Sequence, residues 1–218
     1  MTRQPPPGSY TGTPATTEVP AGTVLSRVHR TAHAACGFNP IASDILFGGG
    51  RFDATDDESY GYLYAGESDE AAVAEALLRD VDANDRGYRF LAKRYWRGRQ
   101  LSRVRTTRPV TVVSLRSGTD LGAIGQDTWL TTCDADDYPQ TRNWAHWLRQ
   151  IVPDAAGIVW ISKREPAAEA FVLFEDRCPA GFLTDAFGPL PFPCVFEEDD
   201  GCAWLRMTLA RYRVTIRC

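Results

Sequence analysis

Residues 61–79 read GYLYAGESDEAAVAEALLR, in which a short aromatic strand is followed at once by a helix. Gly61–Ala65 has the aromatic content and length of a strand. Ser68 is a good N-cap because its hydroxyl can accept a hydrogen bond from the first helical turn, and the two acids after it favour the positive end of the helix dipole. Ala71–Arg79 is rich in helix-forming residues. The stretch therefore predicts a strand that runs directly into a helix.

The remaining globular sequence mixes strands and helices without a regular alternation of the two. Further strands are expected at Thr23–His29, Val110–Leu115, Gly157–Ser162 and Ala170–Phe174, a helix at Thr141–Ile151, and a final strand pair within Leu205–Arg217. Because the elements lack a repeating strand-helix-strand order, the pattern favours an α+β fold over a doubly wound sheet.

Composition favours one globular domain preceded by an arm. The chain has 218 residues, of which 44% are hydrophobic and 24% charged, enough for a sizeable core. Residues 1–22 are rich in Pro, Thr and Gly and poor in apolar side chains, so we expect a flexible N-terminal arm. No second linker follows, and residues 23–218 are predicted to form a single domain.

Charge and hydropathy limit the location and partners of the protein. A net charge of -4 argues against a surface that coats nucleic acid or an anionic membrane. The sequence has no apolar run of membrane-spanning length and no apolar core of a signal peptide. We therefore expect a cytoplasmic protein with no membrane partner.

The cysteines and histidines give little sign of a metal site. The six cysteines contain no CxxC pair, so thiols are expected rather than a zinc site or a disulfide framework. His29, His33 and Cys36 would share a helical face, but their stretch has the pattern of a strand. We expect no metal.

Three sequence blocks are similar to the RES family. They are Gly49-Gly50-Arg51-Phe52, then Tyr62-Leu63-Tyr64-Ala65 running into Ala72-Val73-Ala74-Glu75, and Gly157-Ile158-Val159-Trp160-Ile161-Ser162, with support from Arg27-Val28-His29 and Thr141-Arg142-Asn143-Trp144-Ala145. Their order and spacing carry the resemblance, including the eleven residues between Tyr64 and Glu75.

The resemblance implies a fold, a reaction and a partner. The fold is a mixed sheet with flanking helices, similar to ADP-ribosyltransferases of the diphtheria-toxin type. Members of the family are toxins of toxin-antitoxin pairs and consume NAD by phosphorolysis or hydrolysis, and some ADP-ribosylate a protein. The implied partners are NAD as substrate, inorganic phosphate and a helical antitoxin protein that plugs the active site. Nucleic acid is expected only through that antitoxin. An inactive RES-like module that binds a partner or nucleic acid is the non-enzymatic alternative.

Glu75 is the expected catalytic carboxylate. Cleavage of the nicotinamide-ribose bond passes through an oxocarbenium-like state, which a carboxylate near the ribose stabilises. Small neighbours on its helix face leave room for a ligand. The alternative is a solvated helix residue that pairs with Arg79 four positions later.

Arg51 and Tyr64 are assigned by the resemblance to substrate binding. A guanidinium makes bidentate contacts with phosphate oxygens, so Arg51 would hold the pyrophosphate or an incoming phosphate; otherwise it is a surface arginine that pairs with Asp53 or Asp56. Tyr64 would stack on nicotinamide. Tyr62 lies two positions earlier on the same strand face, so alternation does not separate the two tyrosines.

Ser162, Arg27 and His29 complete the expected site. Ser162 ends a strand and would donate a hydrogen bond to the nicotinamide amide or the ribose, although serine is common in turns. Arg27 and His29 would line the adenosine end of the cleft. The alternative is that both are ordinary surface residues of a strand, with no role in binding.

A basic run interleaved with aromatic residues stays unassigned. Its cations are Arg86, Arg89, Lys93, Arg94, Arg97, Arg99, Arg103, Arg105 and Arg108. The run could contact nucleic acid, an acidic antitoxin or an adjacent protomer, or it could be a solvent-exposed face with no partner. The tail after Arg177 is likewise unassigned.

Overall fold

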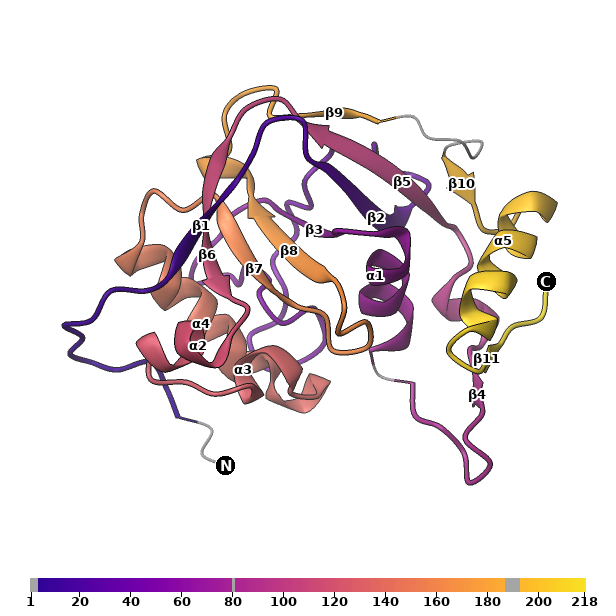
Figure 1. Cartoon of the computed structure of the whole chain (residues 1–218), viewed down its shortest axis with the longest axis horizontal. Helices are drawn as coiled ribbons and strands as arrows, with labels where there is room; N and C mark the ends of the chain where they lie inside the picture. Colours follow the sequence, from indigo (N-terminus) through magenta and orange to yellow (C-terminus); the bar gives the residue numbers. More distant parts are fainter. Residues whose placement is uncertain (1–3, 80, 187–192) are drawn as a thin grey trace.

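The protein is built on a curled mixed sheet with helices against its faces (Figure 1). The computed structural model describes residues 4–79, 81–186 and 193–218. Nine of the described strands form the main sheet in the order β1-β6-β7-β8-β3-β2-β5-β10, with β9 also beside β5. Within it β6 and β7 pair in parallel and the other described pairs are antiparallel. This is the mixed α+β arrangement that the sequence predicts.

The elements have the following bounds. The strands are β1 (Thr16–Val19), β2 (Val24–Arg30), β3 (Tyr62–Gly66), β4 (Arg89–Phe90), β5 (Arg99–Thr106), β6 (Val110–Leu115), β7 (Gly157–Ile161), β8 (Glu169–Phe174), β9 (Leu183–Asp185), β10 (Cys194–Val195) and β11 (Val214–Thr215). The helices are α1 (Asp69–Val73), α2 (Gly118–Ala123), α3 (Trp129–Thr132), α4 (Tyr138–Ile151) and α5 (Asp199–Ala210), and a π-helical turn, η1 (Ala74–Leu78), continues α1. Short 3-10 turns are Lys93–Tyr95, Ala135–Asp137 and Glu175–Arg177.

Two segments of the chain form strands of the main sheet that were not expected from the sequence. Residues 1–22 include β1, which pairs antiparallel with β6, and Val19 of β1 is 4% exposed. The strand β5 lies inside the basic run, and its buried Leu101 and Val104 lie on opposite faces, so that no apolar-polar alternation marks it among the arginines. From composition, residues 1–22 were expected to be a flexible arm and the basic run was left without an assigned element. In the structure, each segment contains a strand that pairs with the main sheet.

The end of the chain corrects the predicted strand pair at Leu205–Arg217. Residues 199–210 form α5 instead, and only the short β11 is extended. Cys202, Leu205 and Leu209 are buried at helical spacing, which outweighs the apolar-polar alternation after Leu205. Two acids, Asp199 and Asp200, occupy the first turn and favour the helix dipole.

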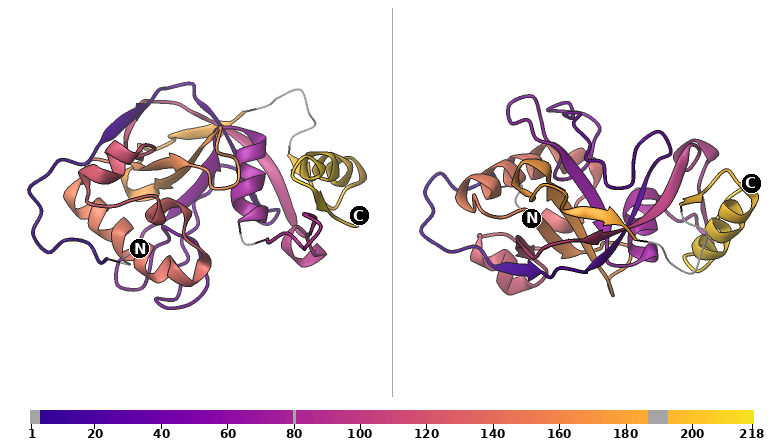
Figure 2. Two further views of the ribbon diagram at one scale, coloured as in Figure 1. Left: turned by 60° about the horizontal axis from the view of Figure 1, so that its bottom comes forward. Right: turned by 90° about the horizontal axis from the view of Figure 1, so that it is seen from above.

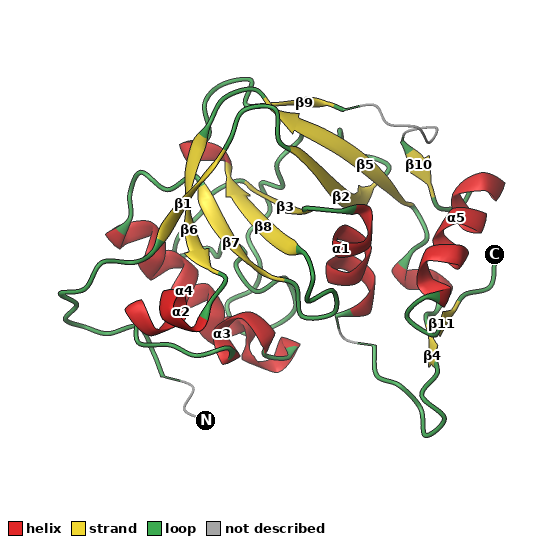
Figure 3. Ribbon diagram, viewed as in Figure 1, coloured by secondary structure: helices red, strands yellow, loops and turns green. Residues whose placement is uncertain are grey.

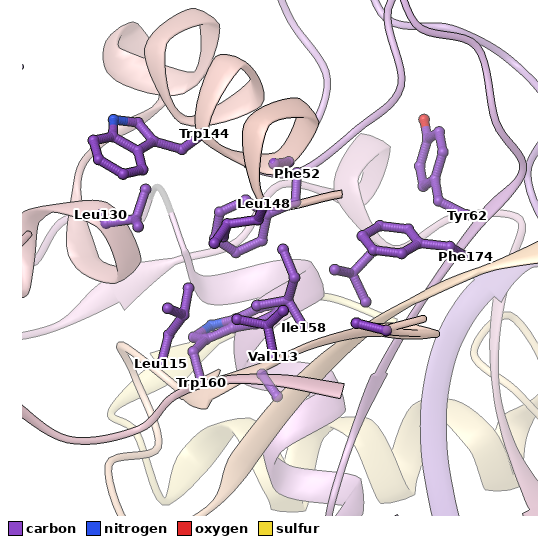
Figure 4. Close-up of a cluster of buried hydrophobic side chains, with 14 of the residues drawn as sticks. Phe52, Tyr62, Val113, Leu115, Leu130, Trp144, Leu148, Ile158, Trp160 and Phe174 are labelled. Atoms are coloured by element: carbon purple, nitrogen blue, oxygen red, sulfur yellow. The ribbon is translucent and has the colours of Figure 1, made fainter. Parts of the chain in front are cut away.

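The larger core lies between α4 and the sheet (Figure 4). Trp144 and Leu148 of α4 pack against Ile158 and Trp160 of β7 and are 0–1% exposed. In both views of Figure 2, α4 and α5 lie at opposite ends of the molecule. A second core joins α5 to α1 and η1 through residues such as Leu77, Phe196 and Leu205.

Two of the six cysteines are paired. Cys202 and Cys218 form a disulfide across a separation of 16 residues, with their Cα atoms 6.0 Å apart. This differs from the expectation of thiols, since spacing alone did not show that the chain end returns to α5. Cys36, Cys133, Cys178 and Cys194 are free.

The described helices are all too short or too polar to cross a bilayer. The connection between β2 and β3, residues 31–61, has neither helix nor strand (Figure 3). This long connection supplies part of the candidate site.

Candidate active site

A cleft opens where β2 and β3 diverge. The two strands share the single pair Ser26 and Gly66. Further along β3, Tyr62 exchanges backbone hydrogen bonds of 2.8 and 3.0 Å with Asn39 instead of with β2. The separation leaves a cavity of about 340 Å³ between the strands.

The cavity gathers charged and aromatic side chains from distant parts of the chain. It is lined by Arg27, Val28, Asn39, Gly49, Gly50, Arg51, Asp53, Tyr62, Tyr64, Ala65, Ala72, Glu75, Ala76, Arg79, Arg99, Trp160 and Ala170. Of the six predicted site residues, Arg27, Arg51, Tyr64 and Glu75 line it directly.

Helix α1 reaches the cleft because Gly66 has no side chain. A Cβ at Gly66 would lie 2.6 Å from the backbone nitrogen of Ala72, so α1 packs closely on the end of β3. Ser68 caps the helix as predicted, accepting a 3.1 Å hydrogen bond from the backbone nitrogen of Ala71. The helix widens into η1 after Val73, and Glu75 lies in this π-helical turn, a conformation that recurs at functional sites.

The structure brings Glu75 and Ser162 together. Ser162 Oγ donates a 2.7 Å hydrogen bond to Glu75 Oε1, and the backbone nitrogen of Lys163 donates to the same oxygen at 3.1 Å. Ser162 is 2% exposed. Two donors thus fix a half-buried carboxylate at the cleft wall, where burial strengthens its electrostatic effect.

Arg51 is buried beside the cavity and is held without a carboxylate. It is 1% exposed, and its Nη2 donates to the carbonyl of Cys133 at 3.1 Å. The guanidinium carbon lies 5.3 Å from the ring centre of Tyr138. Arg51 Nε has no hydrogen-bond partner among the described residues. Its predicted alternative, a surface arginine that pairs with an acid, does not describe this geometry.

Asp53 organises the loop that carries Arg51, a role the sequence did not suggest. Its carboxylate accepts hydrogen bonds from Ser43 Oγ at 2.6 Å, from the backbone nitrogen of Gly50 at 2.7 Å and from Tyr64 Oη at 2.8 Å. A Cβ at Gly50 would lie 2.5 Å from Asp53 Oδ1, so glycine is needed there. The loop is therefore tied to β3 at Tyr64.

Arg142 of α4 anchors the same loop from the opposite side. Its side chain is fully buried and donates to the carbonyls of Asp44, Gly48 and Gly50. The neighbouring Thr141 donates to the carbonyl of Arg51 at 2.7 Å. Both residues belong to the block that supported the family resemblance, although no role for them was predicted.

Tyr64 and Tyr62 both line the cavity, as their shared strand face allowed. The Tyr64 hydroxyl accepts a 2.8 Å hydrogen bond from the backbone nitrogen of Phe52 while donating to Asp53. Burial, followed by the nearby Asp53 charge, holds the pKa of Tyr64 well above its usual value. The phenol is therefore neutral, and its ring is the part available to a ligand.

The two predicted residues of β2 have different surroundings. Arg27 Nη1 donates to the carbonyls of Ala35 at 2.6 Å and Gly37 at 2.8 Å, and burial lowers the pKa of its guanidinium to about 10. His29 does not line the cavity; its Nε2 lies 2.9 Å from Ser102 Oγ. Burial and then the charge of Arg27 lower the pKa of His29 to about 4, so the ring is neutral.

Two further arginines in the cavity were not predicted as site residues. Arg79, just after η1, has its guanidinium carbon 4.7 Å from the ring centre of Tyr138. Burial, and then the charges of Arg30 and Arg79, lower the pKa of Arg99. Together with Arg27 and Arg51 these residues make the cleft strongly cationic, which suits a ligand with phosphate groups.

A metal site is not part of this geometry. Among the described residues, no three His, Cys, Asp or Glu side chains are grouped to hold a metal ion. His29 is engaged with Ser102, while Cys36 Sγ lies 3.5 Å from Asp185 Oδ1.

Comparisons with known proteins agree with the fold and the sequence blocks. The fold is similar to a chain of the crystal structure of the M. tuberculosis MbcT-MbcA toxin-antitoxin complex, with a TM-score of 0.55 and 16% identity over 78% of this chain and 84% of that chain. The two chains therefore share their α+β fold. No curated protein sequence matches the chain. Residues 24–193 match the model of the RES domain, and the chain therefore belongs to the RES domain family.

Proposed function

We propose that the protein cleaves the nicotinamide-ribose bond of NAD and acts as the toxin of a toxin-antitoxin pair. The observation that carries the proposal is the Glu75 carboxylate, held by Ser162 and Lys163 at the wall of a cationic cleft. A fixed carboxylate and several guanidinium groups match the two ends of the reaction, a developing ribosyl cation and a diphosphate.

Glu75 stabilises the transition state. As the bond between ribose C1′ and the nicotinamide nitrogen lengthens, positive charge develops on the ribose and the electron pair leaves with nicotinamide. The carboxylate opposes that charge, and we expect its second oxygen to accept a hydrogen bond from a ribose hydroxyl. The hydrogen bonds from Ser162 and Lys163 keep the carboxylate in position before substrate arrives.

The arginines hold the diphosphate and the aromatic rings enclose the nicotinamide. Arg51 is one anchor because its Nε is buried without a partner among the described residues, and the Nε of Arg27 is in the same condition. Tyr64 and Trp160 line the cavity and give apolar faces for a flat heterocycle.

The acceptor distinguishes two versions of the reaction. Attack of water on C1′ gives ADP-ribose, nicotinamide and a proton. Attack of inorganic phosphate gives ADP-ribose 1″-phosphate and nicotinamide. A second candidate function is ADP-ribosylation of a protein, in which a side chain replaces these acceptors at the open mouth of the cleft.

An antitoxin partner is supported by the loop beside the cleft. Ile41, Ile45, Leu46 and Phe47 are 48–74% exposed, an apolar group on one short segment of a loop that also lines the cavity. Such a patch is typical of a surface that a partner covers. We place both proteins in the cytoplasm, where NAD is available.

Nicotinamide release from NAD tests the proposal. Purified protein is assayed by chromatography in buffer with and without phosphate, beside Glu75→Gln and the control Glu18→Gln, an exposed residue of β1. Glu75→Gln should reduce turnover by about 10²–10³, the scale for loss of one preorganised electrostatic group. The control should match the wild type.

The products separate the alternatives. ADP-ribose 1″-phosphate indicates a phosphorylase and ADP-ribose a glycohydrolase, whereas a protein labelled from adenine-labelled NAD indicates a transferase. Normal turnover by Glu75→Gln would remove the carboxylate from the mechanism, and no reaction with any acceptor would reject the function.

A further inference from the structure

The basic run does not form one surface. Arg99 lines the cleft, Arg103 makes a bidentate ion pair with Asp69, and Arg97 pairs with Glu197. Arg86, Lys93, Arg94, Arg105 and Arg108 are exposed and make no ion pair among the described residues. Three of these five, Arg86, Lys93 and Arg94, lie within four residues of β4 in the sequence.

The C-terminal strand adds two more cations to that region. In the sheet of β4 and β11, Thr215 is paired with Phe90. Val214 and Ile216 are buried, whereas Arg213 and Arg217, which flank this short strand, are exposed. Figure 1 shows this small sheet at the end of the molecule that carries α5, away from α4.

Exposed aromatic rings belong to the same region. Tyr88 and Phe90 are 50% and 58% exposed, and the guanidinium carbon of Arg213 lies 5.0 Å from the ring centre of Tyr88. We call Tyr88, Phe90, Arg213 and Arg217 the ribbon face. Beside it in the sequence, Arg94 lies 4.7 Å from the ring centre of Tyr95, which is 47% exposed.

The backbone of Arg213 is an independent sign that this side chain has a function. Its φ is 56°, and it is the one residue other than glycine with a positive φ among the described residues. The position follows the end of α5, where glycine is the residue with least strain. An arginine is present there despite the strain, and its side chain reaches Tyr88.

We propose that the ribbon face binds single-stranded nucleic acid. The exposed rings of Phe90, in β4, and of Tyr88, just before it, give bases a stacking surface, and nearby arginines with no ion pair among the described residues neutralise phosphates. An acidic protein would form ion pairs with the arginines but would offer no stacking partner to the aromatic rings. The net charge of -4 did not predict this site, because it sums the cations near β4 and β11 with acids elsewhere on the molecule.

Fluorescence anisotropy with labelled 12-mers tests the proposal. The probes are oligo-dT, oligo-U and an abasic strand of equal length, each with the full-length protein at about 50 and 200 mM salt. Oligo-dT and oligo-U should bind, and the abasic strand should bind about 10-fold more weakly because it cannot stack. The higher salt should weaken binding by about 10–20-fold if three phosphates are neutralised. Comparison of oligo-dT with oligo-U separates DNA from RNA.

Matched variants locate the site. Phe90→Ala should weaken oligo-dT binding about 10-fold, and Arg213→Gly should weaken it while keeping or raising the thermal midpoint, since glycine relieves the positive φ. Phe47→Ala and Arg108→Ala remove an exposed ring and an exposed charge elsewhere and should bind as the wild type.

Three results would overturn the proposal. They are absence of oligonucleotide binding at low salt, equal binding of the abasic strand, and an equal loss of affinity in the control variants. Binding of poly-glutamate in preference to oligonucleotides would instead assign the face to an acidic protein. Nicotinamide release should be unchanged in every ribbon variant, which separates this site from the cleft.

Discussion

Arginines that line the cleft or anchor its loop are held differently from arginines in or beside the ribbon face. Arg51 and Arg142 are 0–1% exposed and donate to backbone carbonyls. Arg213 and Arg94 are exposed and lie against tyrosine rings. Among the residues that the structure describes, these four arginines form no ion pair with a carboxylate, in contrast to Arg149, which pairs with Asp176 and Glu58.

The difference shows two ways in which a guanidinium group can be held in position without neutralisation by a carboxylate. A carbonyl oxygen orients a guanidinium strongly and leaves its net charge for a ligand, but only a buried backbone supplies such acceptors. A ring orients it more weakly and suits an exposed surface, where a flexible ligand must be accommodated. The comparison predicts that cleft substitutions lower stability and change catalysis, whereas substitutions at the ribbon face neither lower stability nor change catalysis.

The largest contrast is expected for Arg142→Met against Arg94→Met. Loss of Arg142 removes the donor from three loop carbonyls, and each unsatisfied buried group costs about 1–3 kcal/mol. A loss of about 3 kcal/mol lowers the thermal midpoint by about 6–12 °C in a protein of this size. Calorimetry should show this for Arg142→Met and little change for Arg94→Met. Equal midpoints would mean that the loop does not depend on Arg142.

Arg51→Lys should have the next largest effect, and on substrate binding. Lysine keeps the charge but loses the fork that grips two phosphate oxygens. We expect KM for NAD to rise about 10–100-fold, the scale of one or two charge-assisted hydrogen bonds, with a smaller change in kcat. Arg94→Lys is the control in the same steady-state assay. An unchanged KM would assign the diphosphate to other arginines of the cavity.

The smallest effect is expected for His29→Gln, on the pH dependence of the free energy of unfolding. His29 is buried near the cleft in its neutral form. Its pKa is lowered to about 4 from 6.5, so the unfolded state takes up protons first as pH falls. The free energy of unfolding should be level above pH 6.5 and decrease between pH 6.5 and 4. His29→Gln keeps hydrogen-bonding atoms near Ser102 and should flatten that part of the profile in urea titrations. An identical slope in both proteins would assign the pH dependence to other groups.

Local sequence signals predicted the elements that carry most of the candidate site. The Ser68 cap marked the helix that bears Glu75, and the apolar run from Gly157 marked the strand that ends beside Ser162. Their hydrogen bond joins residues 87 positions apart, and only the family resemblance suggested that the two act together.

Other features depend on tertiary contacts that no local pattern records. A buried arginine such as Arg142 looks like a surface residue of an amphipathic helix until the loop that it binds is known. The π-helical turn at Ala74–Leu78 retains a helix-forming sequence, so its widening was not visible. The strand β5 was hidden because its apolar residues, Leu101 and Val104, do not alternate with its arginines.

The single backbone pair between β2 and β3 has a thermodynamic consequence. A ligand that enters between two fully paired strands must first break their ladder, which reduces its affinity by the free energy of opening. Here the strands are already apart, with Asn39 satisfying the backbone of Tyr62. The cleft is preorganised, so substrate binding need not open the sheet and its contacts can act directly on the bound molecule.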